Sequence, residues 1–183
     1  MAKVGLKYPV YGELKDGAHE AGKVIAEAIK ANITAESNDV KLYGDDRVVE
    51  SDKSFKSGKI SLNVTDLPLE IYASLLGHTY TEADKTVVNS GDDIAPFVGI
   101  GFYGKVQRNS KVKYVAKFVP KVQFSEPNDE TETKGDTVTY QTPTIEGDIF
   151  TMENGKWKEE KECDTEEEAR TWLNGKVGIT ATP

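Results

Sequence analysis

The feature that most restricts the fold of this chain is a long alternating run at residues 112–124. One set of alternate positions is mainly apolar: Val112, Tyr114, Ala116, Phe118, Pro120, Val122 and Phe124. The other set contains Lys113, Val115, Lys117, Val119, Lys121 and Gln123. Because successive side chains of a strand point to opposite faces, this pattern predicts a β-strand with one buried face. Pro120 has no N–H to donate to a neighbouring strand, which predicts a sheet edge or a β-bulge there.

Three further segments are predicted to be strands. Residues 59–65 alternate between apolar side chains and Ser, Asn or Thr. Residues 97–106 place Val98, Ile100 and Phe102 opposite two glycines, and residues 107–110 then predict a hairpin turn into the 112–124 strand. The last strand is expected over residues 137–141, continuing past Pro143 toward Phe150.

A first helix is predicted over residues 67–76. Asp66 can cap it, Pro68 fits its first turn, and Gly77 suits its C-terminal stop. Its apolar side chains recur every four residues, which assigns Leu67, Ile71 and Leu75 to the core.

A second, C-terminal helix is predicted to begin at Asp164 or Thr165. The acidic first turn at residues 166–168 is favoured by the helix dipole. Ala169, Trp172 and Leu173 form its apolar stripe, and Gly175 is expected to end it.

Two segments are less clear from pattern alone. Residues 21–33 are rich in alanine, which favours a helix, but three isoleucines spaced by four residues also allow a strand. Residues 40–55 are polar and poorly periodic, which indicates a long loop or arm.

The composition excludes several classes of protein. A chain of 183 residues suits one domain, and a net charge of -8 argues against a general nucleic-acid binder, because phosphate neutralisation needs a basic surface. The single Cys163 cannot form an intrachain disulfide, and its acidic neighbours disfavour a catalytic thiolate. No signal peptide is expected at residues 1–7, and no apolar run is long enough for membrane insertion.

Residues 99–104 match the G-x-G-x-x-G pattern of dinucleotide sites. Such a site needs the motif between a strand and a helix, and here a turn and another strand follow it. The motif is therefore interpreted as a strand whose glycines leave room for a neighbouring backbone or side chain.

No motif indicates a metal site, a cofactor or an enzyme. His19 and His78 lie far apart in the sequence without ligand spacing around them. The carboxylate pairs at residues 45–46, 92–93 and 129–130 lack EF-hand spacing and are interpreted as solvated loop charge. Because any acidic protein offers carboxylate pairs, a small acidic hydrolase stays an alternative that nothing favours.

Several stretches, taken in order, resemble the major tail proteins of long, non-contractile-tailed phages and prophages, especially those of Gram-positive bacteria. No single motif decides this; the collinear succession over nearly the whole chain does. The stretches are residues 40–55 (VKLYGDDRVVESDKSF), 58–67 (GKISLNVTDL), 75–77 (LLG), 96–102 (PFVGIGF), 120–127 (PKVQFSEP), 132–136 (ETKGD), 141–147 (QTPTIEG) and 172–174 (WLN).

The resemblance implies a mainly β (α+β) fold, an antiparallel β-sandwich or half-barrel with a flanking helix and a short C-terminal helix. It also implies that residues 21–33 form a strand. We expect a single tail tube domain over residues 1–183, with an arm at about residues 40–56 and no appended immunoglobulin-like domain.

The function that the resemblance implies is structural rather than enzymatic. Hexameric rings of the chain would stack into the virion's tail tube, through which DNA passes without specific binding during ejection into the host. The implied partners are the chain itself, a tape-measure protein and the tail-tip and terminator proteins, with assembly in the host cytoplasm. A tube subunit of a phage-like bacteriocin or injection machine is the nearest alternative.

Two sets of residues are candidates for contacts in such a tube. The arm, which we expect to touch a neighbouring ring or subunit, contains Leu42, Tyr43, Asp45, Asp46, Arg47 and Glu50. Candidates for the channel lining are Ser61, Asn63, Thr65, Lys113, Lys117, Lys121, Thr139 and Gln141.

The three lysines conflict with a channel that must not retain DNA, because each phosphate neutralised by a lysine adds affinity. Either they pair with carboxylates of neighbouring strands or of residues 125–135, or only part of the strand faces the channel. Pairing is the preferred interpretation, because crowded like charges on a closed barrel repel one another.

Overall fold

The computed structural model describes residues 3–44, 47–108, 111–128 and 142–180. Its main element is an eight-stranded antiparallel sheet in the order β2-β1-β9-β10-β11-β6-β3, with β12 paired to β10. The strands are β1 (Lys3–Lys15), β2 (Ala18–Val24), β3 (Ala28–Ser37), β6 (Phe55–Val64), β9 (Val98–Arg108), β10 (Lys111–Ser125), β11 (Thr144–Ile149) and β12 (Glu159–Cys163). The predicted mainly β, antiparallel fold with two helices is confirmed.

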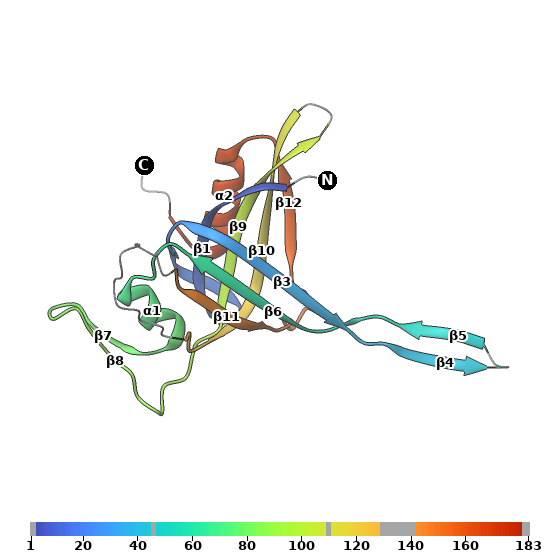
Figure 1. Cartoon of the computed structure of the whole chain (residues 1–183), viewed down its shortest axis with the longest axis horizontal. Helices are drawn as coiled ribbons and strands as arrows, with labels where there is room; N and C mark the ends of the chain where they lie inside the picture. Colours follow the sequence, from blue (N-terminus) through green and yellow to red (C-terminus); the bar gives the residue numbers. More distant parts are fainter. Residues whose placement is uncertain (1–2, 45–46, 109–110, 129–141, 181–183) are drawn as a thin grey trace, which may run out of the picture.

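Two smaller hairpins and two helices complete the described chain. The hairpins are β4 (Val40–Gly44) with β5 (Arg47–Asp52), and β7 (Thr79–Thr81) with β8 (Thr86–Val88). The helices are α1 (Leu69–Leu76) and α2 (Glu166–Val177). The sheet curls into a half-barrel, so that β3 and β6 pass in front of β1, β9 and β10 (Figure 1).

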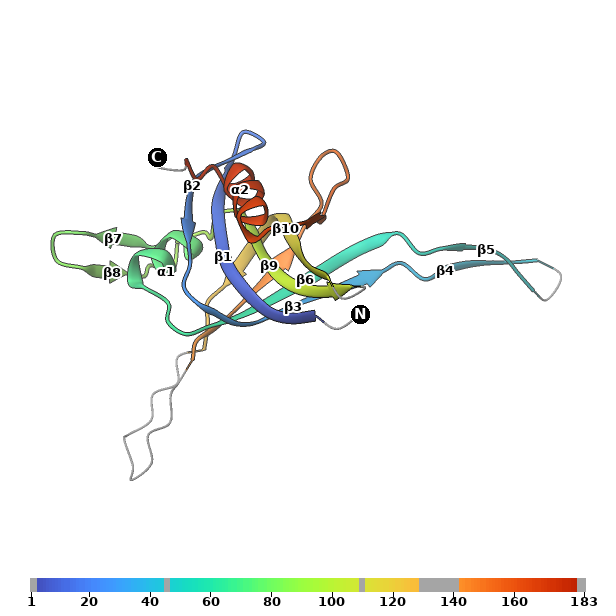
Figure 2. The same cartoon turned by 90° about the horizontal axis from the view of Figure 1, so that it is seen from above.

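The curled sheet buries apolar side chains on both of its faces. The first core lies inside the curl and is covered by α1; it contains Tyr11, Ile25, Ile60, Leu62, Val64, Ile71, Leu75, Leu76, Val98, Ile100, Phe102, Val119, Val122, Phe124, Ile145 and Ile149. The second core lies outside the curl beneath α2 (Figure 2); it contains Val10, Tyr103, Ala116, Phe118, Cys163, Ala169, Leu173 and Val177. Burial on both faces explains how a sheet this strongly curved is held.

β10 contains the bulge that Pro120 predicts. Its pairing with β9 shifts register between Val119 and Val122. The prediction of one apolar face along the whole strand is wrong, because the extra residue moves the even positions from one core to the other. Phe118 lies in the second core, whereas Val122 and Phe124 lie in the first.

The helix ends differ in part from the predicted ones. α1 begins after Pro68, and the Asp66 carboxylate accepts a hydrogen bond from the Leu67 N–H at 2.8 Å instead of capping the helix. Gly77 ends α1 in the left-handed conformation, as predicted. Leu67 is half-buried against the first core, and Ile71 and Leu75 are buried in it.

α2 has the predicted start but a later end. The Thr165 hydroxyl accepts a hydrogen bond from the Glu168 N–H at 3.2 Å, which caps the helix. Gly175 does not end it; the helix continues to Val177, and Gly178 takes the left-handed cap with φ of 74°. Val177 is fully buried, so one further turn gains packing against the sheet.

The two ambiguous segments are both extended. Residues 21–33 supply the end of β2 and the start of β3, separated by residues 25–27, whereas the resemblance implies a single strand there. Residues 40–55, interpreted as a loop or arm, hold the paired strands β4 and β5 and the start of β6. The strand expected from residue 137 is seen only as β11, because residues 129–141 lie outside the described part of the chain, Thr139 and Gln141 among them.

Candidate functional site

The β4–β5 hairpin is the most conspicuous projection of the molecule. It continues β3 and β6 beyond the sheet, and its base is closed by Asn38 and Ser54, whose backbone N–H and C=O bond at 2.8 Å. Both views show it extending away from the body with no other labelled element beside it (Figures 1 and 2). The two strands form a separate two-stranded sheet, and an isolated two-stranded hairpin is marginally stable in water.

The structure places most of the predicted arm residues on this hairpin. Leu42 and Tyr43 belong to β4, and Arg47 and Glu50 to β5. Leu42 is in register with Glu50, and Gly44 with Arg47. Asp45 and Asp46 lie outside the described residues.

The candidate lining residues divide between the two faces of the sheet. Directly opposed residues of an antiparallel pair share a face, and Lys117 opposes the buried Phe102. Lys113 and Lys117 therefore lie on the face of the first core, toward the end of β10 that the core does not fill. Ser61 and Asn63 alternate with core residues of β6 and lie on the opposite face, and exposed Thr65 follows that strand.

Lys121 joins Ser61 and Asn63 rather than the other two lysines. The bulge places Lys121 on the same face as Gln123. Gln123 opposes Asp148 of β11, and Asp148 opposes Lys59 of β6, so all of them share the face of Ser61 and Asn63. The ammonium of Lys121 lies 4.5 Å from the ring centroid of Phe97. The six candidates within the described residues thus do not form one continuous surface, and Thr139 and Gln141 lie outside the described residues.

The lysines on the first-core face are paired with carboxylates, which bears out the preferred interpretation for these two. Lys113 forms an ion pair with Asp164, which raises the pKa of the lysine and lowers that of the aspartate. Lys117 lies 3.1 Å from Glu160 of β12. Glu160 belongs to β12, the strand beside β10, and Asp164 directly follows it.

On the opposite face, Asn63 is held by neutral partners. Its amide donates to the Thr144 hydroxyl at 2.8 Å and to the Thr142 hydroxyl at 3.2 Å. Asn63 therefore presents a fixed, uncharged polar surface across β6 and β11.

The G-x-G-x-x-G segment lies in β9, in the middle of the sheet, and a strand follows it. A Cβ on Gly99 would lie 2.6 Å from the ring of His19, and one on Gly101 would lie 2.6 Å from Leu173 of α2. A Cβ on Gly104 would lie 2.9 Å from the backbone oxygen of Gly5. The interpretation of these glycines as packing positions is confirmed.

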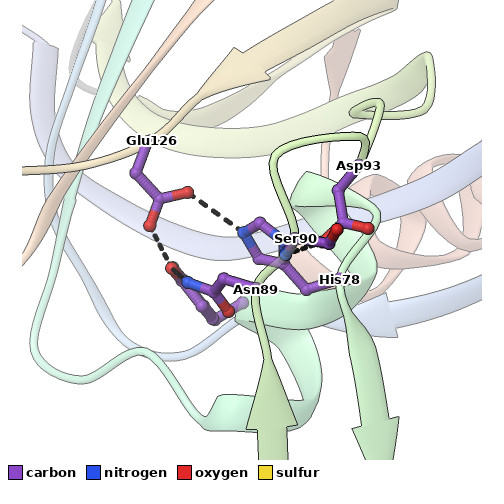
Figure 3. A network of polar contacts seen from close by, with 6 residues as sticks. His78, Asn89, Ser90, Asp93 and Glu126 are labelled. Atoms are coloured by element: carbon purple, nitrogen blue, oxygen red, sulfur yellow. Dashed lines mark hydrogen bonds and ion pairs between the residues drawn. The ribbon is translucent and has the colours of Figure 1, made fainter.

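A polar network around His78 ties three segments together (Figure 3). His78 Nδ1 lies 2.7 Å from Asp93 Oδ2, and Nε2 lies 3.0 Å from Glu126 Oε2. The Ser90 N–H also donates to Asp93, at 2.8 Å. The network fastens the segment between β8 and β9 and the end of β10 to the C-terminal end of α1.

The electrostatics of this network favour a charged imidazole. The hydrogen bond with Asp93, followed by that with Glu126, raises the pKa of His78 although its side chain is only 8% exposed. The Ser90 N–H and then His78 lower the pKa of Asp93. Asp93 is therefore not the solvated loop charge that the sequence suggests, and no sequence signal joins His78 to a glutamate 48 residues away.

Among the described residues no group of three or more His, Cys, Asp or Glu side chains is arranged to hold a metal ion. Cys163 is buried beneath α2, and burial is the main cause that raises its thiol pKa. Neither helix of the described chain is long and apolar enough to cross a membrane.

The curled antiparallel sheet, the packed helices and the projecting hairpin agree with the comparison that decides the family. Residues 11–161 match the family described as phage tail tube protein. The chain belongs to the phage tail tube protein family. No curated protein matches the chain. Phage tail tube proteins are structural components of the virion tail. They assemble with copies of themselves and with other tail proteins.

Proposed function

We propose that this tail tube protein forms hexameric rings whose sheets join, and that the rings stack into the tube through which phage DNA passes during ejection. The β4–β5 hairpin carries the proposal, because it extends from the body (Figure 2) and its strands pair with each other in a sheet separate from the main one. β2 and β3 are the two end strands of the sheet, and their free edges can pair with strands of a second copy. The proposed partners are a tape-measure protein and the tail-tip and terminator proteins.

The hairpin is proposed to contact the adjacent ring. Removing residues 44–51 should leave both cores intact, because the β4–β5 hairpin is a sheet separate from the eight-stranded one. We expect a folded monomer with an unchanged melting temperature that fails to form tubes in negative-stain electron micrographs, whereas the intact chain forms them. Normal tubes from the deletion variant would refute the hairpin's role.

The channel is proposed to let DNA pass without holding it. The ion pairs of Lys113 and Lys117 support this, because paired lysines release fewer counterions from DNA than free ones. Empty tubes should not retain duplex DNA at physiological salt.

A paired-charge variant tests whether this face lines the channel. Asp164→Asn with Glu160→Gln removes the carboxylates and leaves both lysines in place. If the face lines the channel, tubes of the variant should retain DNA in a salt-dependent manner. Retention by wild-type tubes would refute the non-adhesive channel, and no retention by the variant would place this face away from the DNA.

A further inference from the structure

The charges of the chain are separated into two blocks that follow each other in sequence. Residues 94–125 contain six basic side chains and no acidic one: Lys105, Arg108, Lys111, Lys113, Lys117 and Lys121. Residues 66–93 contain six acidic side chains, one lysine and one histidine: Asp66, Glu70, Glu82, Asp84, Asp92, Asp93, Lys85 and His78. In a chain of net charge -8, a basic block of this length is not explained by composition.

The basic block has surplus charge at the free end of the β9–β10 hairpin. Lys113, Lys117 and Lys121 each have a carboxylate or ring partner, but Lys105 and Lys111 are exposed and form no ion pair with the described residues. Lys105 stands opposite Tyr114 and therefore lies on the second-core face, whereas Lys111 lies on the first-core face with Lys113 and Lys117. The end of this hairpin therefore presents an exposed lysine on each of its two faces.

The acidic block has its own surplus on the β7–β8 lobe, which we define as residues 79–93. Glu70 is paired with Lys23, and Asp93 with His78. Glu82, Asp84 and Asp92 are exposed and form no ion pair within the described part of the chain. Glu82 is near enough to Lys23 to help raise the pKa of that lysine, and Lys85 lies in the lobe, so the lobe keeps a net negative charge that is partly compensated.

The two surplus patches lie on opposite sides of the molecule. Both views place the β7–β8 lobe and the free end of the β9–β10 hairpin on different sides of the sheet body (Figures 1 and 2). They cannot neutralise each other within one subunit. Two unlike patches at opposite ends are what a head-to-tail contact between identical subunits requires.

We propose that the basic end of the β9–β10 hairpin, through Lys105 and Lys111, docks on the β7–β8 lobe of a second copy, at Glu82 and Asp84. This inference rests on the proposed function, because it names one contact by which copies assemble. Charges at these exposed positions steer encounter and fix orientation more than they add affinity. The contact therefore makes the subunits associate head to tail and makes their rate of association sensitive to salt.

Charge reversal at each end, alone and together, tests the contact. One variant combines Lys105→Glu with Lys111→Glu, the other combines Glu82→Lys with Asp84→Lys, and the third joins all four changes. Lys156→Glu, at an exposed position on the turn between β11 and β12, is the charge control. Each is assayed by light scattering for association, by electron microscopy for tubes and by thermal melting for folding.

We expect both two-site variants to melt like the wild type, to associate roughly ten-fold or more slowly and to form no tubes. The four-site variant and a mixture of the two two-site variants should associate again, and the control should behave as the wild type does. Association should slow as salt rises from about 0.05 to 0.5 M.

The outcomes separate this inference from the proposed function. If all variants form tubes at the wild-type rate, the contact is refuted and the tube stands. If salt-sensitive association recovers on recombining the charges but no variant forms tubes, the contact stands and the tube is refuted. If the wild-type monomer binds duplex DNA through Lys105 and Lys111 and assembly ignores their reversal, the hairpin end is a nucleic-acid site and the inference is overturned.

Discussion

The packing of α2 against the sheet can be tested by two glycine-to-alanine substitutions. One is expected to lower the melting temperature and the other to raise it. A Cβ on Gly12 of β1 would lie 2.5 Å from the backbone oxygen of Val177 and 3.0 Å from its Cα. Backbone atoms cannot turn aside as a side chain can, so α2 would have to move off the sheet. Overpacking of this kind costs about 1–3 kcal/mol of unfolding free energy. For a domain of this size that corresponds to a melting temperature lower by about 2–12 °C.

Gly175 is the matched control within the helix itself. A Cβ there meets nothing within 4 Å, and the residue is exposed in the interior of α2. Replacing glycine by alanine inside a helix contributes roughly 0.5–1 kcal/mol, so Gly175→Ala should raise the melting temperature by about 1–4 °C. Circular dichroism melts of both variants measure the two shifts. A Gly12→Ala variant that melts like the wild type would show that the end of α2 does not rest on β1.

Two further perturbations probe α1 and its polar network. Leu75 is 1% exposed, so Leu75→Ala should lower the unfolding free energy by about 2–5 kcal/mol, as measured in urea. Leu69 of the same helix is 53% exposed, so Leu69→Ala should change the unfolding free energy little. Equal effects of the two substitutions would contradict the packing of α1. Because the folded pKa of His78 is raised above its ordinary 6.5, its ionic contribution is complete below that pH and is lost as pH rises through the raised value. Because the pKa of Asp93 is lowered from 3.8, the stabilisation that its charge provides is lost in acid. The difference in stability between wild type and His78→Phe should therefore be largest at about pH 4–6.5. A difference that stays constant from pH 5 to 9 would rule out a charged His78.

The parts of the fold that local sequence predicts are those whose cause is local. The alternation around Phe118 and the missing N–H of Pro120 predict a strand with a bulge, and Thr165 with its acidic first turn predicts the start of α2. The glycines of β9 are also read correctly, because a glycine-rich strand followed by a strand has no helix to place a phosphate on. The sequence does not indicate that His19 and Leu173 are the side chains that pack against these glycines.

The parts that sequence does not predict depend on distant residues. The polar segment around Leu42 and Glu50 lacks the alternation of a half-buried strand, yet β4 and β5 pair with each other in a separate two-stranded sheet. His78 meets Asp93 and Glu126 only because the end of α1 and the end of β10 converge in the fold. The later end of α2 follows from the burial of Val177, a tertiary gain that outweighs the weak helix propensity of Gly175.

The bulge in β10 decides how the strand's lysines are distributed. In a regular strand Lys113, Lys117 and Lys121 would all lie on one face, each four residues from the next, and every subunit would present the same basic row. The register shift between Val119 and Val122 transfers Lys121 to the other face, where it meets the ring of Phe97, and leaves the other two beside the carboxylates of Glu160 and Asp164. One inserted residue thus divides the charge between two surfaces and turns the even positions after it toward the first core, with Val122 and Phe124. If rings place either face toward DNA, at most two of the three lysines face it, and fewer lysines neutralise fewer phosphates.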